Sequence, residues 1–191
     1  MRRCHINNES VFIGVDFGAK IAGTTAICFA QQGKLKVLQT AKGKDADRFL
    51  SNQIEIIKPS FVLIDAPLSL PDAYFGKGED FFFRHCDRQL KAMSPLFLGG
   101  LTARAMQLAS RFASTVFIET YPKALAEHLQ ISHYKQQPIN WKELEQQLPL
   151  PLEQPTSQHG YDAVLAWLSG YRYVTGQAMR AGTEAEGLIT Y

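Results

Sequence analysis

The sequence predicts an α/β protein whose sheet has a parallel core. Three apolar, strand-forming runs each end in a single acid, at Asp16, Asp65 and Glu119. A segment with helical periodicity follows the first of these runs, as a right-handed crossover between parallel strands requires. In open α/β sheets, ligand sites lie beyond the carboxyl ends of the strands. The pattern therefore also predicts an acidic cluster at one edge of the sheet.

The acids that end these three runs are not explained by turn formation alone. They read Val-Phe-Ile-Gly-Val-Asp over residues 11–16, Phe-Val-Leu-Ile-Asp over 61–65 and Thr-Val-Phe-Ile-Glu over 115–119. A lone Asp after a strand commonly caps a turn. Burying an acid is costly unless a cation pairs with it. Three strands that each deliver one acid therefore favour a shared site over three separate caps.

Length and composition fit one globular domain. The chain has 191 residues, of which 46% are hydrophobic and 20% are charged. No apolar run is long enough to span a membrane, and no signal peptide is evident, so we expect a cytoplasmic protein with no membrane partner. The three cysteines are scattered, which fits a reducing compartment and no zinc spacing. A net charge of +2 permits a nucleic-acid partner without requiring one.

The first third of the chain predicts a meander and a crossover helix. Three antiparallel strands are expected at about 10–16, 24–30 and 34–40, with a hairpin signal between the last two. A helix is expected over 45–57, with Asp45 as its N-cap. Lys58-Pro59 ends that helix before the strand at 61–64.

Residues 66–100 are the least regular part of the chain. Prolines and glycines break up any long element, and only a short helix at 87–92 is expected. Five aromatic residues are crowded here, at Tyr74, Phe75, Phe81, Phe82 and Phe83. They fit a loop packed down by its own aromatics. They also fit an aromatic-lined lid on which bases could stack.

The rest of the chain predicts one further strand with helices before and after it, and a long final helix. The expected elements are a helix at 101–113, a strand at 115–118, a helix at 122–130, an insertion at 131–155 and a helix at 156–174. Asp162 lies near the start of the last helix. The tail at 181–191 is small and polar, so the predicted sheet has five strands. The whole chain, 1–191, is expected to form one domain.

This order of elements matches the ribonuclease H-like arrangement, in which the sheet order is 3-2-1-4-5. Strands one, four and five are then neighbours, and the last helix crosses strand one. The arrangement implies that Asp16, Asp65, Glu119 and Asp162 meet at one point.

Several motifs carry a more specific resemblance over nearly the whole chain. They are Gly14-Val15-Asp16-Phe17-Gly18, Asp65-Ala66-Pro67-Leu68-Ser69, Arg84-His85-Cys86-Asp87-Arg88, Glu119-Thr120-Tyr121-Pro122, Tyr161-Asp162-Ala163 and Glu186-Gly187-Leu188-Ile189. Together they resemble an uncharacterised family of predicted ribonuclease H-like nucleases, a domain of unknown function. The first motif, with Lys20, also resembles that of Holliday-junction resolvases. The resemblance is weakest over 131–155, and it implies a fold and a candidate acidic site.

Clustered carboxylates would suit a metal-dependent nuclease. Hard divalent cations such as Mg²⁺ or Mn²⁺ relieve their repulsion, and two such ions can cleave a phosphodiester. We expect Asp16 to bridge the ions, Asp65 and Glu119 to flank them, and Asp162 to add a ligand from the helix. His159, one turn before Asp162, could move a proton or could be an ordinary surface histidine.

Three basic residues are candidates for contacting the phosphate of a nucleic acid. Arg84 and Arg88 could bind it in a bidentate manner, or could anchor the loop through salt bridges. Lys20 could contact phosphate or could simply be a solvent-exposed residue of its turn. Two other functions stay open: a non-catalytic binding module, and a phosphotransferase of the actin and sugar-kinase type, which needs two such domains. The sequence does not distinguish DNA from RNA as the substrate.

Overall fold

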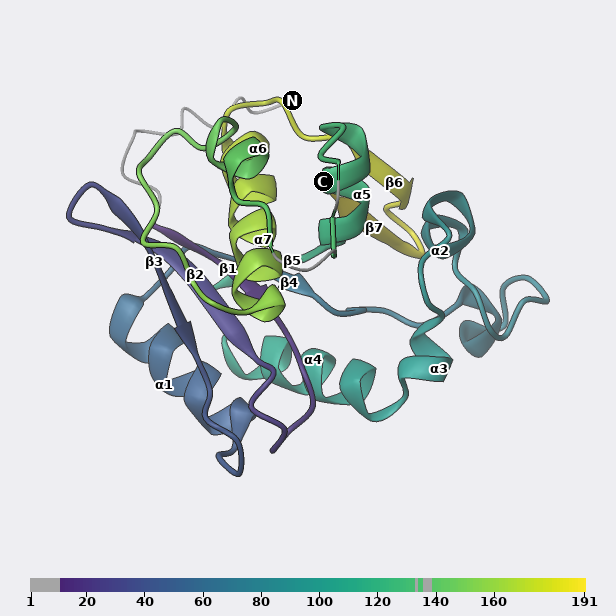
Figure 1. The fold of residues 1–191 in the computed structure, drawn as a ribbon. Helices are drawn as coiled ribbons and strands as arrows, with labels where there is room; N and C mark the ends of the chain where they lie inside the picture. The colour runs from purple at the N-terminus through teal and green to yellow at the C-terminus, as the bar shows by residue number, and fades with distance from the viewer. Residues whose placement is uncertain (1–10, 133, 136–138) are drawn as a thin grey trace.

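The fold is built on one mixed sheet of seven strands, shown in Figure 1. The computed structural model describes residues 11–132, 134–135 and 139–191. The strand order is β3-β2-β1-β4-β5-β7-β6. The strands are β1 (Phe12–Asp16), β2 (Ala26–Gln31), β3 (Lys34–Gln39), β4 (Phe61–Asp65), β5 (Val116–Thr120), β6 (Arg180–Thr183) and β7 (Gly187–Thr190). The five-stranded prediction is wrong because the tail adds a hairpin, β6–β7, beside β5.

The four central strands β1, β4, β5 and β7 are parallel, and the outer strands run antiparallel to their neighbours. The inner strand order 3-2-1-4-5 agrees with the sequence prediction. The strand β6 reads Arg-Ala-Gly-Thr and has no apolar alternation. It pairs because the hairpin is placed against β5, which local sequence does not reveal.

Helices cover both faces of the sheet. They are α1 (Ala46–Ile57), α2 (His85–Leu90), α3 (Pro95–Leu98), α4 (Gly100–Arg111), α5 (Pro122–His128), α6 (Lys142–Glu145) and α7 (Gln158–Val174), with a 3₁₀ turn η1 (Asp72–Phe75). Figure 1 shows α7 across one face of the sheet, and α1 and α4 on the other. Two separate apolar cores result, one under α7 and one under α1 and α4.

Gly14 lets α7 approach the centre of the sheet. A Cβ atom on Gly14 would lie 2.0 Å from the backbone nitrogen of Trp167 and 2.6 Å from the carbonyl oxygen of Ala163. The neighbouring Ile13 and Val15 are buried in the core on the other face. Residues two apart in a strand share a face, so Asp16 projects toward α7, as Gly14 does.

Local signals placed several elements correctly. Asp45 caps α1 as expected, and its Oδ1 accepts from the backbone N–H groups of Asp47 and Arg48 at 2.9 and 3.1 Å. The short helix in the irregular region begins earlier than expected, at His85, because the Asp87 carboxylate accepts from the backbone N–H of Arg84.

The segment 66–100 leaves the carboxyl end of β4 and is tied to the far edge of the sheet. Glu186, in the β6–β7 turn, accepts from the backbone N–H of His85 at 2.7 Å and of Asp72 at 3.2 Å. These bonds fasten η1 and α2 to the added hairpin. No helix among the described residues is both long and apolar enough to cross a membrane.

Candidate functional site

Asp16 and Asp65 are the last residues of adjacent parallel strands. They lie directly opposite each other in the β1–β4 register. Strands in a sheet are about 4.8 Å apart, and opposite residues project from the same face. The two aspartates therefore form a pair on the α7 face, at the edge where open α/β sheets bind ligands. This juxtaposition is the one that the strand-then-acid pattern predicts.

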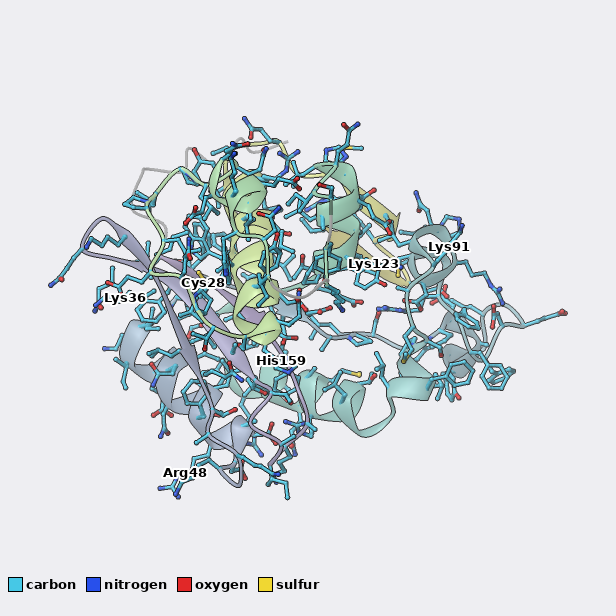
Figure 2. The ribbon with its side chains drawn as sticks, viewed as in Figure 1. Cys28, Lys36, Arg48, Lys91, Lys123 and His159 are labelled. Atoms are coloured by element: carbon cyan, nitrogen blue, oxygen red, sulfur yellow. The ribbon has the colours of Figure 1, made fainter. Side chains whose placement is uncertain are left out.

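The first turn of α7 supplies a histidine to this pair. The Nδ1 atom of His159 lies 2.7 Å from Oδ2 of Asp16, and Figure 2 shows His159 at that end of the helix. The hydrogen bond with Asp16 raises the pKa of His159. Burial raises the pKa of Asp16, and the contact with His159 partly offsets that rise. The histidine thus serves as an internal cationic partner when protonated.

Asp162, one turn further along α7, is held by neighbours from two segments. Its Oδ1 accepts from the Tyr134 hydroxyl at 2.8 Å and from the Gln158 amide at 3.0 Å. The Lys135 ammonium lies 3.8 Å from its Oδ2. Burial, followed by the charge of Asp16, raises the pKa of Asp162 to about 6. The sequence did not indicate Tyr134 or Lys135, because they come from the insertion, where no periodic pattern marks a contact.

Asp65 is affected both by burial and by the neighbouring carboxylates. Burial raises its pKa well above the usual value, and the charges of Asp16 and Asp162 raise it further. The three carboxylates are thus coupled, and they repel one another unless a proton or a cation intervenes. Such perturbed carboxylates are common at functional sites.

Glu119 is separated from the aspartate pair by the register of β5. It lies opposite Ile64 and not Asp65, so its side chain leaves the other face of the sheet. Its two oxygens each accept from Arg84 at 2.7 Å, and one also accepts from the backbone N–H of Leu68. This placement differs from the expected flanking role, in which its carboxylate faces the same ion as Asp65.

Arg84 is fully buried and its donors are occupied. Besides Glu119, it donates to both oxygens of Asp87 at 2.7 and 3.0 Å, and to the Ser69 hydroxyl at 2.9 Å. These contacts match the loop-anchor alternative and leave no donor for a phosphate. Gly187 makes room for the network, because a Cβ there would lie 2.4 Å from the Ser69 hydroxyl.

The other two predicted phosphate contacts are also paired elsewhere. Arg88 donates from Nε to Asp80 at 2.8 Å, and its guanidinium lies 4.8 Å from the centre of the Phe83 ring. Lys20 lies 3.5 Å from Asp45, at the start of α1. Both side chains are exposed, so these pairs are weak.

A pocket of about 310 Å³ opens beside the aspartate pair. Its lining includes Asp16, Phe17, Asp65, Ala66, Pro67, Asp87, Ala92, Met93, Leu98, Leu101, Glu119, Thr120, Tyr121, Lys135 and Ile189. Residues from 66–100 thus border the site, as expected from their exit beyond Asp65. The pocket lining combines carboxylates with apolar side chains.

The four-carboxylate metal cluster expected from the sequence is not formed. Within the described part of the chain, no group of three or more His, Cys, Asp or Glu side chains is arranged to hold a metal ion. Glu119 is held by Arg84, and Asp162 by Tyr134 and Gln158. The pair Asp16–Asp65 still fits a hard cation, because Mg²⁺ commonly uses one or two carboxylates together with substrate phosphates.

Comparison with known proteins finds a similarity among solved structures and none among family models or curated proteins. No protein-family model and no curated protein matches the chain. Among solved structures, that of Thermus thermophilus RuvC is similar, with 16% identity and a TM-score of 0.47. The match covers 90% of this chain and 98% of that one.

Proposed function

We propose that this protein is a divalent-metal-dependent nuclease that hydrolyses phosphodiester bonds of nucleic acids. The observation that carries the proposal is the Asp16–Asp65 pair at the carboxyl ends of two adjacent parallel strands. Asp162 adds a third coupled carboxylate from α7. Buried carboxylates at this edge need a cation, and hard oxygen ligands favour Mg²⁺ or Mn²⁺.

Each residue has a separate role in this proposal. Asp16 and Asp65 would hold the ion, and Asp162 would add negative charge from α7. A divalent ion bound there would polarise the phosphodiester and lower the pKa of an attacking water. His159, already oriented by Asp16, moves a proton at the edge of the site. Glu119 is left out of the ligand set because Arg84 engages both of its oxygens.

A cleavage assay tests the proposal directly. Labelled single-stranded and double-stranded DNA and RNA are incubated with the protein and either Mg²⁺ or Mn²⁺, with chelator in a parallel series. We expect cleavage of at least one substrate only with the metal. Asp16→Asn and Asp65→Asn should each lower the rate by at least about 100-fold, the lower limit for losing a catalytic proton-transfer or charge-stabilising group.

The matched control is Asp80→Asn, which changes a partly exposed carboxylate outside the pocket that pairs with Arg88 and accepts from the backbone N–H groups of Phe82 and Phe83. It should retain the parent rate. If no substrate is cleaved by the parent protein, or if both aspartate variants cleave at the parent rate, the nuclease proposal is refuted. Binding of nucleic acid without any cleavage would instead support the binding-module alternative.

A further inference from the structure

The pocket beside the aspartate pair is lined by two chemically different sets of side chains, carboxylates and apolar residues. We propose that it takes one unpaired nucleotide, with the phosphate at the aspartate pair and the base against the apolar wall. The location of the phosphate rests on the proposed function. The remaining evidence comes from two pocket residues outside the aspartate pair, Lys135 and Met93.

Lys135 supplies positive charge where an anion must approach carboxylates. Its ammonium lies 3.8 Å from Asp162 and also lines the pocket, while its side chain stays 57% exposed. A phosphate that enters this site is repelled by Asp16 and Asp65 unless cations accompany it. Lys135 is therefore placed to contact the phosphate from the solvent side while the metal neutralises the aspartates.

The apolar wall comes from the segment 66–100 and the start of α4. Met93 is 60% exposed although it lines the pocket, and Leu98 and Leu101 lie partly buried beside it. A base can pack its face on such side chains, and a methionine sulfur interacts well with aromatic rings. These apolar side chains thus offer a packing surface for a base, which the carboxylates cannot offer.

The size of the pocket is compatible with a ligand of about one nucleotide. Its volume of about 310 Å³ is near the lower end of the range for small-ligand pockets. A base inside a duplex is stacked and cannot enter a pocket without being flipped out. The substrate class is therefore a single-stranded segment, a strand end or a flipped nucleotide, and not an intact double helix.

Calorimetry with small probes tests this inference without relying on cleavage. Deoxyadenosine monophosphate, 2-deoxyribose 5-phosphate and inorganic phosphate are titrated into the protein in Mn²⁺. We expect the nucleotide to bind at least tenfold more tightly than the sugar phosphate. Met93→Ser should reduce that ratio to below threefold. The matched control Met179→Ser removes an exposed methionine outside the pocket and should keep it.

Lys135→Met tests the polar end with the same probes. It removes the ammonium group from the pocket lining and should weaken the binding of all three phosphates by a similar factor, at least threefold. Melting temperatures of each variant establish that it is folded. Equal affinity for the nucleotide and the sugar phosphate in the parent protein would overturn the inference, as would a Met93→Ser ratio equal to that of the parent.

The two proposals fail in different ways. Cleavage of nucleic acid without measurable binding of the nucleotide would refute the pocket assignment and leave the nuclease standing. Binding of the nucleotide with the expected ratio, but no cleavage of any substrate, would refute the nuclease and leave the pocket as a nucleotide-binding site.

Discussion

Replacing Arg84 by methionine should cost this protein a large part of its stability. The guanidinium is fully buried and is the cation shared by two buried carboxylates, Asp87 and Glu119. Removal of one partner of a buried ion pair costs about 3–5 kcal/mol, because the other charge stays buried and unpaired. Here two carboxylates lose their partner, so we expect a loss near the upper value, about 5 kcal/mol. Typical domains have only about 5–15 kcal/mol in total.

The loss in Arg84→Met should depend on pH with a definite sign. Burial raises the pKa of Glu119, and Arg84 partly offsets that rise. Without Arg84, the pKa of Glu119 rises further, so the folded state holds its proton more tightly than the unfolded state does. The penalty for ionising Glu119 is absent below the unfolded pKa near 4.5 and grows as the pH rises above it. A tenfold tighter hold on this proton corresponds to a penalty of about 1.4 kcal/mol.

Urea denaturation at pH 7 and pH 5 measures both effects, with the parent protein compared at the same pH. The deficit of Arg84→Met should be smaller at pH 5 than at pH 7. A second substitution, Glu119→Gln, should recover part of the loss at pH 7. The matched control Arg88→Met removes an exposed arginine and should cost less than about 1 kcal/mol. A deficit below about 1 kcal/mol for Arg84→Met, or one that grows on acidification, would refute this account.

Three further substitutions test the packing and the site. Thr120→Val removes a hydroxyl that has no hydrogen-bond partner among the described residues, and it should leave the urea midpoint unchanged or higher. Thr102→Val breaks a 2.7 Å hydrogen bond to the Pro95 carbonyl and should lower the stability by about 1 kcal/mol. Equal losses of stability in the two variants would contradict this difference in hydrogen bonding. Gly14→Ala should destabilise by about 3 kcal/mol or more or prevent folding, because its Cβ meets the backbone of α7, while Gly100→Ala meets nothing within 4 Å and should be tolerated. Without metal, Asp16→Asn should have a melting temperature no lower than that of the parent protein. It should lose the stabilisation by Mn²⁺, which is about 2.7 kcal/mol when the Mn²⁺ concentration is about a hundred times Kd. A Mn²⁺ effect on the melting temperature as large as in the parent would rule Asp16 out as a ligand.

Local patterns in the sequence were enough to locate the sheet core and the aspartate pair. Apolar β-branched and aromatic residues before Asp16 and Asp65 form strands wherever they are buried, and a crossover helix between them makes those strands parallel. The cap at Asp45 is likewise local, because it depends on residues two and three positions away.

The partners of the remaining site residues depended on contacts between distant segments. Arg84 meets Glu119 across 35 positions, and His159 meets Asp16 across 143. A basic residue in the sequence indicates charge, but not which carboxylate will be nearest after folding. For Arg84, the sequence therefore left a phosphate contact and a loop anchor equally open.

The register of β5 illustrates the division between sequence and structure most clearly. That a strand would end at an acid was evident from the sequence, and Glu119 does lie near the carboxyl end of β5. Side chains alternate between faces along a strand, so a shift of one residue decides whether an acid joins a site or leaves the opposite face. The sequence determined the strands, their acids and the edge at which they end. Only the tertiary structure decided that Glu119 lies on the other face of the sheet and pairs with Arg84, because register and hairpin addition are set by packing between elements.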